Sequence, residues 1–428
     1  MLNTIGVVAD DTTGANDMGI MFKKSGYSVK VLSLKENDAI NIDTNVVVVD
    51  TDSRLDTPEE SYKKVYMATK QLQEAGCKMY YNKTCSVFRG NIGAEFDAML
   101  DALQQNFAVI VLGFPKNGRV TKNGIHMVNG EKLENSPFYN DPVHPMKDSN
   151  LKRILEGQTN RLVTSISLDE VRKGAGILKE KIQDVKENGF HYCIIDTETQ
   201  EDLSIIAEAA IQMPVLCGSS AIGEELPKFF NENPIKQETH RTYSNENQGV
   251  LVVSGSLTPQ TKEQTAFLKE KGIIALEIDT SNIFEEETFA KEKAKLIEVA
   301  GSRISEGNDL LLMAHDNKSI VEKTKEIGRT QGLTELETSK RVSSVLAQIT
   351  RKIADNVNLQ RLIVAGGDTS GTVCKELGIE GNYILDEVAV GVPSGFTIGR
   401  ELLIILKSGS FGDEKFLFDA IHHLKEVS

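Results

Sequence analysis

The chain lacks the features that would place it in a membrane, in an oxidising compartment or on nucleic acid. Its five cysteines form no CxxC pair and no regular spacing, which is typical of free thiols in a reducing cytoplasm. No apolar run approaches the roughly 20 residues that cross a bilayer, and no signal peptide is evident. Basic residues are in deficit, because 48 Lys and Arg stand against 62 Asp and Glu. We therefore expect a cytoplasmic protein with no membrane or nucleic-acid partner.

Several standard cofactor motifs are missing as well. The sequence has no GxGxxG fingerprint, which makes a dinucleotide cofactor a weak hypothesis. The segment GGDTSGT (366–372) resembles a phosphate loop but lacks the lysine of GxxxxGK[ST]. The seven histidines, among them His126, His144 and His315, form no HxH, HxxxH or HExxH pattern, so we expect none of them to bind a metal.

What the sequence does contain is an alternation of short apolar runs with longer amphipathic segments. At 428 residues it is long enough for two domains. Valine- and isoleucine-rich runs predict buried parallel strands at 4–9, 45–50, 107–113, 191–196, 250–256, 273–278, 309–314, 361–367 and 401–410. Helix start and stop signals predict helices at 58–76 and 90–105, and others beginning at Pro259, ending near 305 and spanning about 335–357. The pattern indicates an α/β fold with mainly parallel sheets.

Two segments interrupt this alternation. Residues 114–150 are polar and contain four prolines and Asn-Gly pairs, which predicts an irregular excursion with a hairpin. The polar stretch 231–249 is the best linker candidate. We predict an N-terminal domain over 1–235, a linker over 236–248 and a C-terminal domain over 249–428. Ligands often bind where domains meet, so we expect the active site in an interdomain cleft.

Three strands of the C-terminal half end in small, glycine-rich turns, SGSLTPQT (254–261), AGGDTSGT (365–372) and KSGSFGD (407–413). Glycine lets the backbone approach a ligand closely, and free N–H groups at helix N-termini attract phosphate. One such turn often does no more than cap a helix. Three in one domain favour a nucleotide site over simple capping.

Strand ends in the N-terminal half carry charge instead. Asp10 and Asp11 follow the first strand; one could merely cap the next helix, but both together favour a site. Basic groups at several strand ends could bind a carboxylate by charge-assisted hydrogen bonds, although each alone could be a surface ion pair. The candidates are Arg54, Lys83, Arg89 and Arg119. An anion-and-hydroxyl site in one domain and a phosphate site in the other indicate phosphoryl transfer from ATP to a small polar acceptor.

These motifs resemble those of the four-carbon acid sugar kinase family, and the likeness spans nearly the whole chain. ADDTTGA (9–15) matches the start of the family pattern, and Ser53-Arg54 matches a later pair. Further matches, in order, are Lys83, Ser86 and Arg89-Gly90-Asn91 with Gly93; FPKNGR (114–119); DPVHP (141–145); Gly255-Ser256 with Gln264; GGDT (366–369); and KSGSFG (407–412).

The resemblance implies an ATP-dependent kinase that phosphorylates the terminal 4-hydroxyl of D-threonate or D-erythronate; the alternatives are 3-oxo-tetronate or a longer aldonate. It implies that Asp10 or Asp11, as catalytic residue, together with Arg54 and the segment Lys83, Thr84, Cys85 and Ser86, contacts the acid sugar. It places ATP at the turns that hold Ser254, Gly255 and Ser256, then Gly366, Gly367, Asp368 and Thr369, and Gly409. We expect Mg²⁺ to accompany ATP, with Asp368 as a ligand, and Arg89 and Arg119 to bind substrate.

Two positions depart from the family pattern. Many members have Asp where this chain has Cys85, and Glu where it has Asp368. The first lies in the substrate-binding segment and leaves the substrate's identity open. A non-catalytic sensor of sugar acids or nucleotides is a further alternative, which the intact Asp10 and Asp11 argue against. Assembly as a homodimer stays open.

Overall fold

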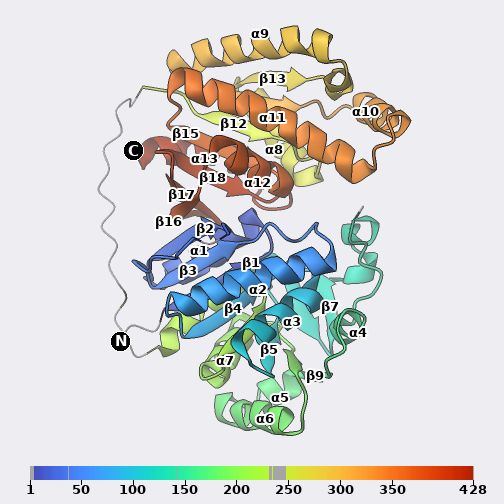
Figure 1. Cartoon of the computed structure of the whole chain (residues 1–428), viewed down its shortest axis with the longest axis vertical. Helices are drawn as coiled ribbons and strands as arrows, with labels where there is room; N and C mark the ends of the chain where they lie inside the picture. Colours follow the sequence, from blue (N-terminus) through green and yellow to red (C-terminus); the bar gives the residue numbers. More distant parts are fainter. Residues whose placement is uncertain (1–3, 37, 142, 231–233, 235–246, 428) are drawn as a thin grey trace. The chain divides into compact units, whose positions relative to one another are not determined.

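The computed structural model describes residues 4–36, 38–141, 143–230, 234 and 247–427, and it divides into two compact units, Met1–Gln237 and Glu238–Ser428 (Figure 1). Residues 236–246 of the predicted linker lie outside the described residues. Within the described ranges, no helix is long and apolar enough to cross a membrane. Each unit is an α/β fold with a mainly parallel sheet, as predicted.

The main sheet of the first unit is parallel at every described pairing. In pairing order its strands are β2 (Val29–Ser33), β3 (Val46–Asp50), β1 (Ile5–Ala9), β4 (Met79–Lys83), β11 (Val215–Gly218), β5 (Ala108–Val111), β10 (Tyr192–Ile195) and β9 (Val163–Ile166). Its helices are α1 (Thr12–Lys24), α2 (Pro58–Glu74), α3 (Ile92–Leu103), α4 (Leu151–Glu156), α5 (Leu168–Val171), α6 (Ala175–Glu187) and α7 (Gln200–Ala210). Short 3₁₀ turns are η1 (Pro115–Asn117), η2 (Leu133–Asn135), η3 (Pro137–Asn140), η4 (Ala221–Glu224) and η5 (Leu226–Phe229).

Helices cover both faces of this sheet, which explains why its strands are apolar throughout rather than alternating. Val47 and Val49 of β3 pack in a cluster with residues of α2 and α3, while Val46 and Val48 face the other side and are equally buried. Local signals set the helix ends. Pro58 opens α2 after a capping box formed by Thr57 and Glu60.

The polar excursion forms a small antiparallel sheet, β6 (Arg119–Lys122), β7 (Ile125–Val128) and β8 (Glu131–Lys132). Its two turns are Asn123-Gly124 and Asn129-Gly130, and all four of these residues have positive φ. Two consecutive positive φ values are what a tight hairpin turn requires, so the hairpin predicted from Asn-Gly pairs is confirmed.

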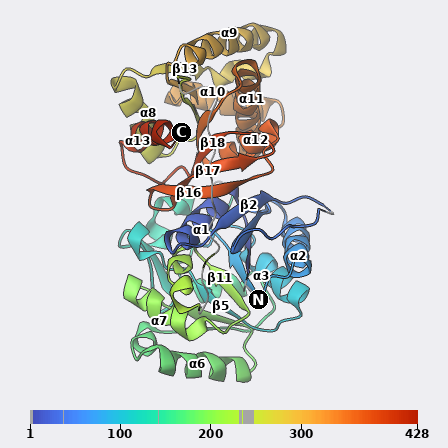
Figure 2. The ribbon, with the colours of Figure 1, turned by 90° about the vertical axis from the view of Figure 1, so that its left-hand side faces the viewer.

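The second unit repeats the covered parallel sheet and adds an antiparallel edge. In pairing order its strands are β13 (Ile274–Ile278), β14 (Leu310–Ala314), β12 (Leu251–Ser254), β15 (Arg361–Ala365), β18 (Leu403–Lys407), β17 (Val392–Ile398) and β16 (Gly381–Ala389). Its helices are α8 (Pro259–Glu270), α9 (Glu286–Ser305), α10 (Lys318–Thr330), α11 (Glu335–Val357), α12 (Gly367–Leu377) and α13 (Phe416–Glu426), with η6 (Thr280–Phe284). Figure 2 shows α8 and α13 on one side of this sheet and α11 and α12 on the other.

Some of these elements were predicted from the sequence and others were not. The long helix α11 occupies the predicted range. The strands predicted at 250–256, 361–367 and 401–410 end two or three residues earlier than predicted, where the glycine-rich turns begin. Strands β2, β4, β9, β11, β16 and β17 were not predicted. Several of them carry polar side chains inside the strand, as in Lys30, Asn82 and Thr164, which breaks up the apolar run that marks a buried strand.

Candidate functional site

Asp10, Asp11 and Arg54 come together at one edge of the first sheet. Strand β1 pairs with β3, and both run in the same direction, so the residues that follow them meet at the carboxyl edge. Arg54 holds both carboxylates: Nε and Nη2 donate to Asp10 over 2.7 Å each, and Nη1 and Nη2 donate to Asp11 over 2.6 and 2.8 Å. The guanidinium therefore bridges the two acids.

Asp11 has a second, structural role. Its Oδ1 accepts the backbone N–H of Gly14 at 2.8 Å, which makes it the N-cap of α1. Burial alone would raise the pKa of this carboxyl, but the charges of Arg54 and Lys83 and two hydrogen bonds outweigh burial and lower it. Asp11 therefore caps α1 and also binds Arg54, and it is ionised at neutral pH.

Close packing around the pair depends on Gly90, whose φ is +108°. A Cβ there would lie 3.3 Å from Arg54 Cγ and 3.6 Å from Asp10 Oδ2. The same glycine and His144 line a cavity of about 370 Å³, with Phe88, Lys147 and Gln158 among its other walls. His144 also meets the Arg54 carbonyl through Nε2 at 2.8 Å. A cavity large enough for a small polar molecule therefore borders the Arg54 segment.

The segment after β4 supplies the next group. Lys83 Nζ donates to the Thr84 carbonyl at 3.1 Å and lies 3.7 Å from Asp17 Oδ2. Cys85 is buried, and its Sγ accepts Arg89 Nε at 3.4 Å. Burial would raise the pKa of this thiol, but Arg89 and Arg54 outweigh burial and lower it. Both guanidinium groups therefore favour the thiolate form of Cys85, an effect that its sequence context did not indicate. The Ser86 carbonyl contacts His126 Nε2.

The three candidate arginines differ in what they have already bound. Arg54 is committed to Asp10 and Asp11, and Arg89 donates to Asp141 over 2.6 Å. Arg119 is 6% exposed and donates from Nη1 to the Asn117 carbonyl and side chain. Its Nε has no hydrogen-bond partner, and none of the described ion pairs includes it. Arg119 interacts electrostatically with Cys85 and Asp17, so it belongs to the same cluster.

Two further buried acids near the pair were missed by the sequence analysis. Glu95 of α3 accepts Ser53 Oγ at 2.7 Å, and Asp50 ends β3. Burial is the main cause that raises the pKa of Glu95 to about 8, with the charge of Asp10 adding to it. Burial likewise raises the pKa of Asp50 to about 7. Their only sequence signal is an acid within an apolar run.

In the second unit the three glycine-rich turns meet at the carboxyl edge of β12, β15 and β18. Backbone bonds link them, from Gly255 N to the Ala365 carbonyl at 3.2 Å and from Gly366 N to the Lys407 carbonyl at 2.8 Å. A Cβ at Gly255 would lie 2.3 Å from Thr369 Oγ1, and one at Gly409 would lie 2.7 Å from Ser256 Oγ. The sequence therefore needs glycine at these positions for the turns to approach one another.

Hydroxyl groups and one lysine organise this second cluster. The Gly409 carbonyl accepts Thr258 Oγ1 at 2.6 Å, Thr261 Oγ1 at 2.8 Å and Lys407 Nζ at 3.1 Å. Ser256 Oγ lies 3.1 Å from Thr258 Oγ1. Asp368 is exposed in the first turn of α12. The three turns were predicted from the sequence, but Thr258, Thr261 and Lys407 were not among the predicted site residues.

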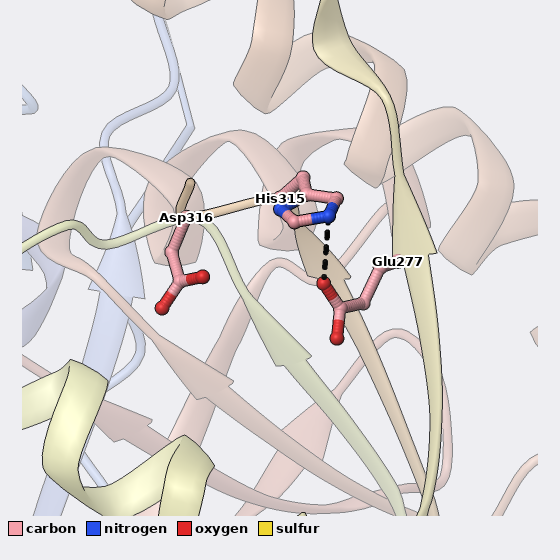
Figure 3. Close-up of side chains that lie close together, drawn as sticks. All are labelled: Glu277, His315 and Asp316. Carbon is pink, nitrogen blue, oxygen red and sulfur yellow. Dashed lines mark ion pairs between the residues drawn. The ribbon is translucent and has the colours of Figure 1, made fainter. Parts of the chain in front are cut away.

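Glu277, His315 and Asp316 also lie close together, at the ends of β13 and β14 (Figure 3). Their candidate ligand atoms are within 4.8 Å of one another. The donors are already engaged: Lys269 Nζ lies 2.5 Å from Glu277 Oε1, His315 Nδ1 accepts the Asn317 N–H at 3.2 Å, and His315 Nε2 faces Glu277 Oε2 at 3.4 Å. These contacts describe a polar cluster built around the ion pair of Lys269 and Glu277.

Comparisons with known proteins agree with a division into a sugar-binding first unit and a nucleotide-binding second unit. Residues 5–226 match the model of a sugar-binding N-terminal domain, and residues 251–417 match that of a nucleotide-binding C-terminal domain. A 3-oxo-tetronate kinase of Cupriavidus necator is 31% identical and aligns with 98% of this chain and 97% of its own. A D-threonate kinase of Salmonella typhimurium is 29% identical, with 98% of each chain aligned.

Solved structures show the same fold. A protein of Salmonella typhimurium LT2 superposes with a TM-score of 0.83 at 27% identity, covering 98% of this chain and 99% of that one. A Haemophilus influenzae protein superposes with a TM-score of 0.74 at 26% identity, covering 98% and 100%. Together with the matched domains and relatives, these likenesses show that the chain belongs to the four-carbon acid sugar kinase family.

Proposed function

We propose that this chain transfers the γ-phosphoryl group of ATP to the terminal 4-hydroxyl of a four-carbon acid sugar. The observation that carries the proposal is the pair of carboxylates that Arg54 bridges at the end of β1, within the part of the chain that matches a sugar-binding domain. Carboxylates of this kind accept hydrogen bonds from sugar hydroxyls and can accept a proton.

For the acceptor we propose D-threonate or D-erythronate, with a 3-oxo-tetronate as the second candidate. Relatives named for D-threonate and for 3-oxo-tetronate match the chain at similar identity, 29% in both cases. These acids share a carboxylate at one end and a primary hydroxyl at the other. The site must therefore provide a basic group that binds the carboxylate and a hydrogen-bond acceptor for the primary hydroxyl.

Arg119 is the best anchor for the substrate carboxylate. Arg54 and Arg89 already bind acids of the protein, whereas Arg119 is buried and its Nε donor has no partner. A buried guanidinium N–H without a hydrogen-bond partner among the described residues is unfavourable, and a carboxylate ligand would supply that partner by a forked hydrogen bond. Lys83, Thr84, Cys85, Ser86 and Arg89 would complete the substrate contacts. The sequence left Arg54, Lys83, Arg89 and Arg119 as candidates for the anchor, and among them we propose Arg119.

Asp10 and Asp11 would hold the acceptor hydroxyl and receive its proton. The bond between O4 and the γ-phosphorus forms, the bond from that phosphorus to the bridging oxygen of ADP breaks, and the hydroxyl proton passes to one carboxylate and then to water. The lowered pKa of Asp11 makes it a weak base. That is sufficient, since a loose phosphoryl-transfer transition state needs positioning and charge neutralisation more than early proton removal.

The glycine-rich turns would hold ATP through backbone N–H groups, with Ser254, Ser256 and Thr369 beside them. Mg²⁺ binds through one or two carboxylates together with substrate phosphates and water, and the exposed Asp368 at the start of α12 fits that donor set. Bound there, the ion would neutralise phosphate charge. Transfer then requires the acceptor hydroxyl and the γ-phosphate to meet.

The test is ADP release from ATP and Mg²⁺ with a panel of acceptors: D- and L-threonate, D- and L-erythronate, 3-oxo-tetronates, and five- and six-carbon aldonates. We expect a strong response to one four-carbon acid. Phosphorylation of only a longer aldonate would contradict the substrate class. Binding of ATP with no turnover on any member of the panel would favour the sensor alternative.

A further inference from the structure

Lys407 is a buried lysine without an acidic partner in the described part of the chain. It ends β18, and its side chain is 0% exposed. Nζ donates to Thr261 Oγ1 at 2.7 Å and to the Gly409 carbonyl at 3.1 Å. No described ion pair includes it, whereas Lys425, in the same unit, is paired with Asp309 at 2.8 Å. A buried ammonium among neutral groups is rare, because removing a charge from water is costly unless it is paired.

The surroundings of the amine are neutral from each element that contacts it. Thr261 approaches from α8, Gly409 from the following turn, and the neighbouring strand β15 places Ala365 beside it in register. Burial is the one cause of the shift in its pKa, which falls to about 7, and no charged group adds to it. Near pH 8 the amine in the free protein is therefore largely uncharged.

The position of Lys407 suggests why the chain retains this unfavourable group. It lies beneath the turn that holds Gly409, and its own carbonyl accepts the N–H of Gly366 in the neighbouring turn. Those turns are the ones expected to hold nucleotide phosphates, and apart from Lys407 they contain no basic residue, only hydroxyls, glycines and apolar or amide side chains with the acids Asp368 and Asp413. Lys407 is the cation placed under them.

We propose that Lys407 is a positioning residue of the nucleotide site, whose ammonium fixes the Gly409 turn and balances the charge of bound phosphates, so that ATP binding is coupled to uptake of a proton by this amine. This inference rests on the nucleotide site of the proposed function. A nearby polyanion favours the charged form of the amine, and by linkage the charged form favours the polyanion.

The protonation state of Lys407 in the free protein sets how ATP affinity changes with pH. Well below pH 7 the amine already carries its proton, so ATP binding takes up none there. Above pH 7 binding must supply a proton, and ATP affinity falls as pH rises, by up to about tenfold per pH unit for one proton. The fall ends where the bound amine itself loses its proton.

The experiment is calorimetric titration of the full chain with ATP and excess Mg²⁺ at pH 8, in buffers of different ionisation enthalpy. We expect wild type to take up most of one proton, whereas Lys407→Met takes up none and shows a flat pH dependence between 7 and 8.5. Lys407→Arg stays charged and cannot lose its proton, so it should keep high affinity at pH 8.5 without proton uptake. Lys425→Met, which removes the paired lysine, serves as control and should behave as wild type.

The outcomes separate the two proposals. ATP binding by wild type without proton uptake, or with uptake that persists in Lys407→Arg, would overturn the role of Lys407 and leave the kinase proposal standing. Absence of ATP binding by folded wild type at any pH would overturn the nucleotide site itself. If Lys407→Met fails to fold, the comparison of wild type with Lys407→Arg still decides the matter.

Discussion

The two candidate sites solve the binding of an anion in opposite ways. In the first unit, charged groups are paired with one another: Arg54 bridges Asp10 and Asp11, and Arg89 binds Asp141. In the second, three turns are held by hydroxyls, a carbonyl and the buried amine of Lys407. Both lie at the carboxyl edge of a parallel sheet, so the fold sets the place of each site and the side chains set its chemistry.

The difference matches the ligands we propose. An acid sugar has one negative charge and several hydroxyls. Fixed carboxylates can bind the hydroxyls, and the guanidinium of Arg119 can bind the charge, each by directional hydrogen bonds. A polyphosphate has many equivalent oxygens, so backbone N–H groups and glycine suit it better than fixed side-chain pairs. Each site also contains a buried ionisable group whose pKa is shifted toward neutral pH. The pKa of Glu95 is raised to about 8, and the pKa of Lys407 is lowered to about 7.

The largest expected effect comes from breaking the paired acids. Asp11→Asn should lower kcat by about 10²- to 10⁴-fold, the usual contribution of a positioned acid or base, while ATP affinity stays unchanged. Asn is as good an N-cap as Asp, so α1 should remain intact. Steady-state kinetics and an ATP titration measure both quantities. Glu156→Gln, which removes the exposed pair with Lys152, is the matched control; loss of ATP binding in Asp11→Asn would refute the division of roles.

The next effect, on the KM for the acid sugar, distinguishes Arg119 from Arg54 and Arg89, which already bind acids of the protein. Arg119→Met should raise KM for the acid sugar by about 10- to 100-fold, since hydrogen bonds to a charged group contribute roughly 1.5–3 kcal/mol. Arg153→Met, at an exposed ion pair, should leave KM as it is. Initial rates across substrate concentrations decide the question. If Arg89→Met raises KM and Arg119→Met does not, the anchor is Arg89.

A smaller effect, on ATP affinity, is expected at the glycine-rich turns of the second unit. Gly409→Ala would place a methyl group 2.7 Å from Ser256 Oγ and 2.8 Å from Thr258 Cγ2, which forces the hydroxyl network apart. We expect about a tenfold loss of ATP affinity, equivalent to roughly 1.4 kcal/mol, with acid-sugar binding unaffected. Gly176→Ala in α6 meets nothing within 4 Å and should at most stabilise the helix. Equal ATP affinity in both variants would show that the Gly409 turn is not part of the site.

The last prediction concerns the stability of the fold rather than turnover. Because burial raises the pKa of Glu95 to about 8, the folded protein holds a proton there that the unfolded chain releases above about 4.5. This contribution to stability is complete below pH 4.5 and is lost as pH rises through about 8. Glutamine does not titrate, so Glu95→Gln does not lose this stability as pH rises. The difference in Tm between Glu95→Gln and wild type should therefore shift in favour of Glu95→Gln between pH 5 and 8. A pH series of calorimetric scans measures this, with Glu156→Gln, in an exposed pair, as a control whose offset stays constant.

Much of the fold and part of the site could be predicted from pattern alone. Apolar runs located most central strands, because a strand covered on both faces tolerates few polar residues. The order of strands and turns was enough to expect Asp10, Asp11 and Arg54 at one edge of a sheet. The antiparallel pair β16 and β17 was not predicted, since β16 is only partly buried and the buried β17 contains Pro393, Ser394 and Gly395, which break up its apolar run.

The sequence by itself determined which groups reach each sheet edge, since strand ends and glycine-rich turns are local features that read directly from the chain. Only the tertiary structure decided which of these groups are already bound. Arg54, Arg89 and Arg119 look alike in sequence, and Lys407 looks like any lysine after an apolar run. Their different roles depend on partners 44, 52 or 146 positions away, and on burial that no local pattern encodes. Electrostatic pairing and desolvation act through space, so they follow from the fold.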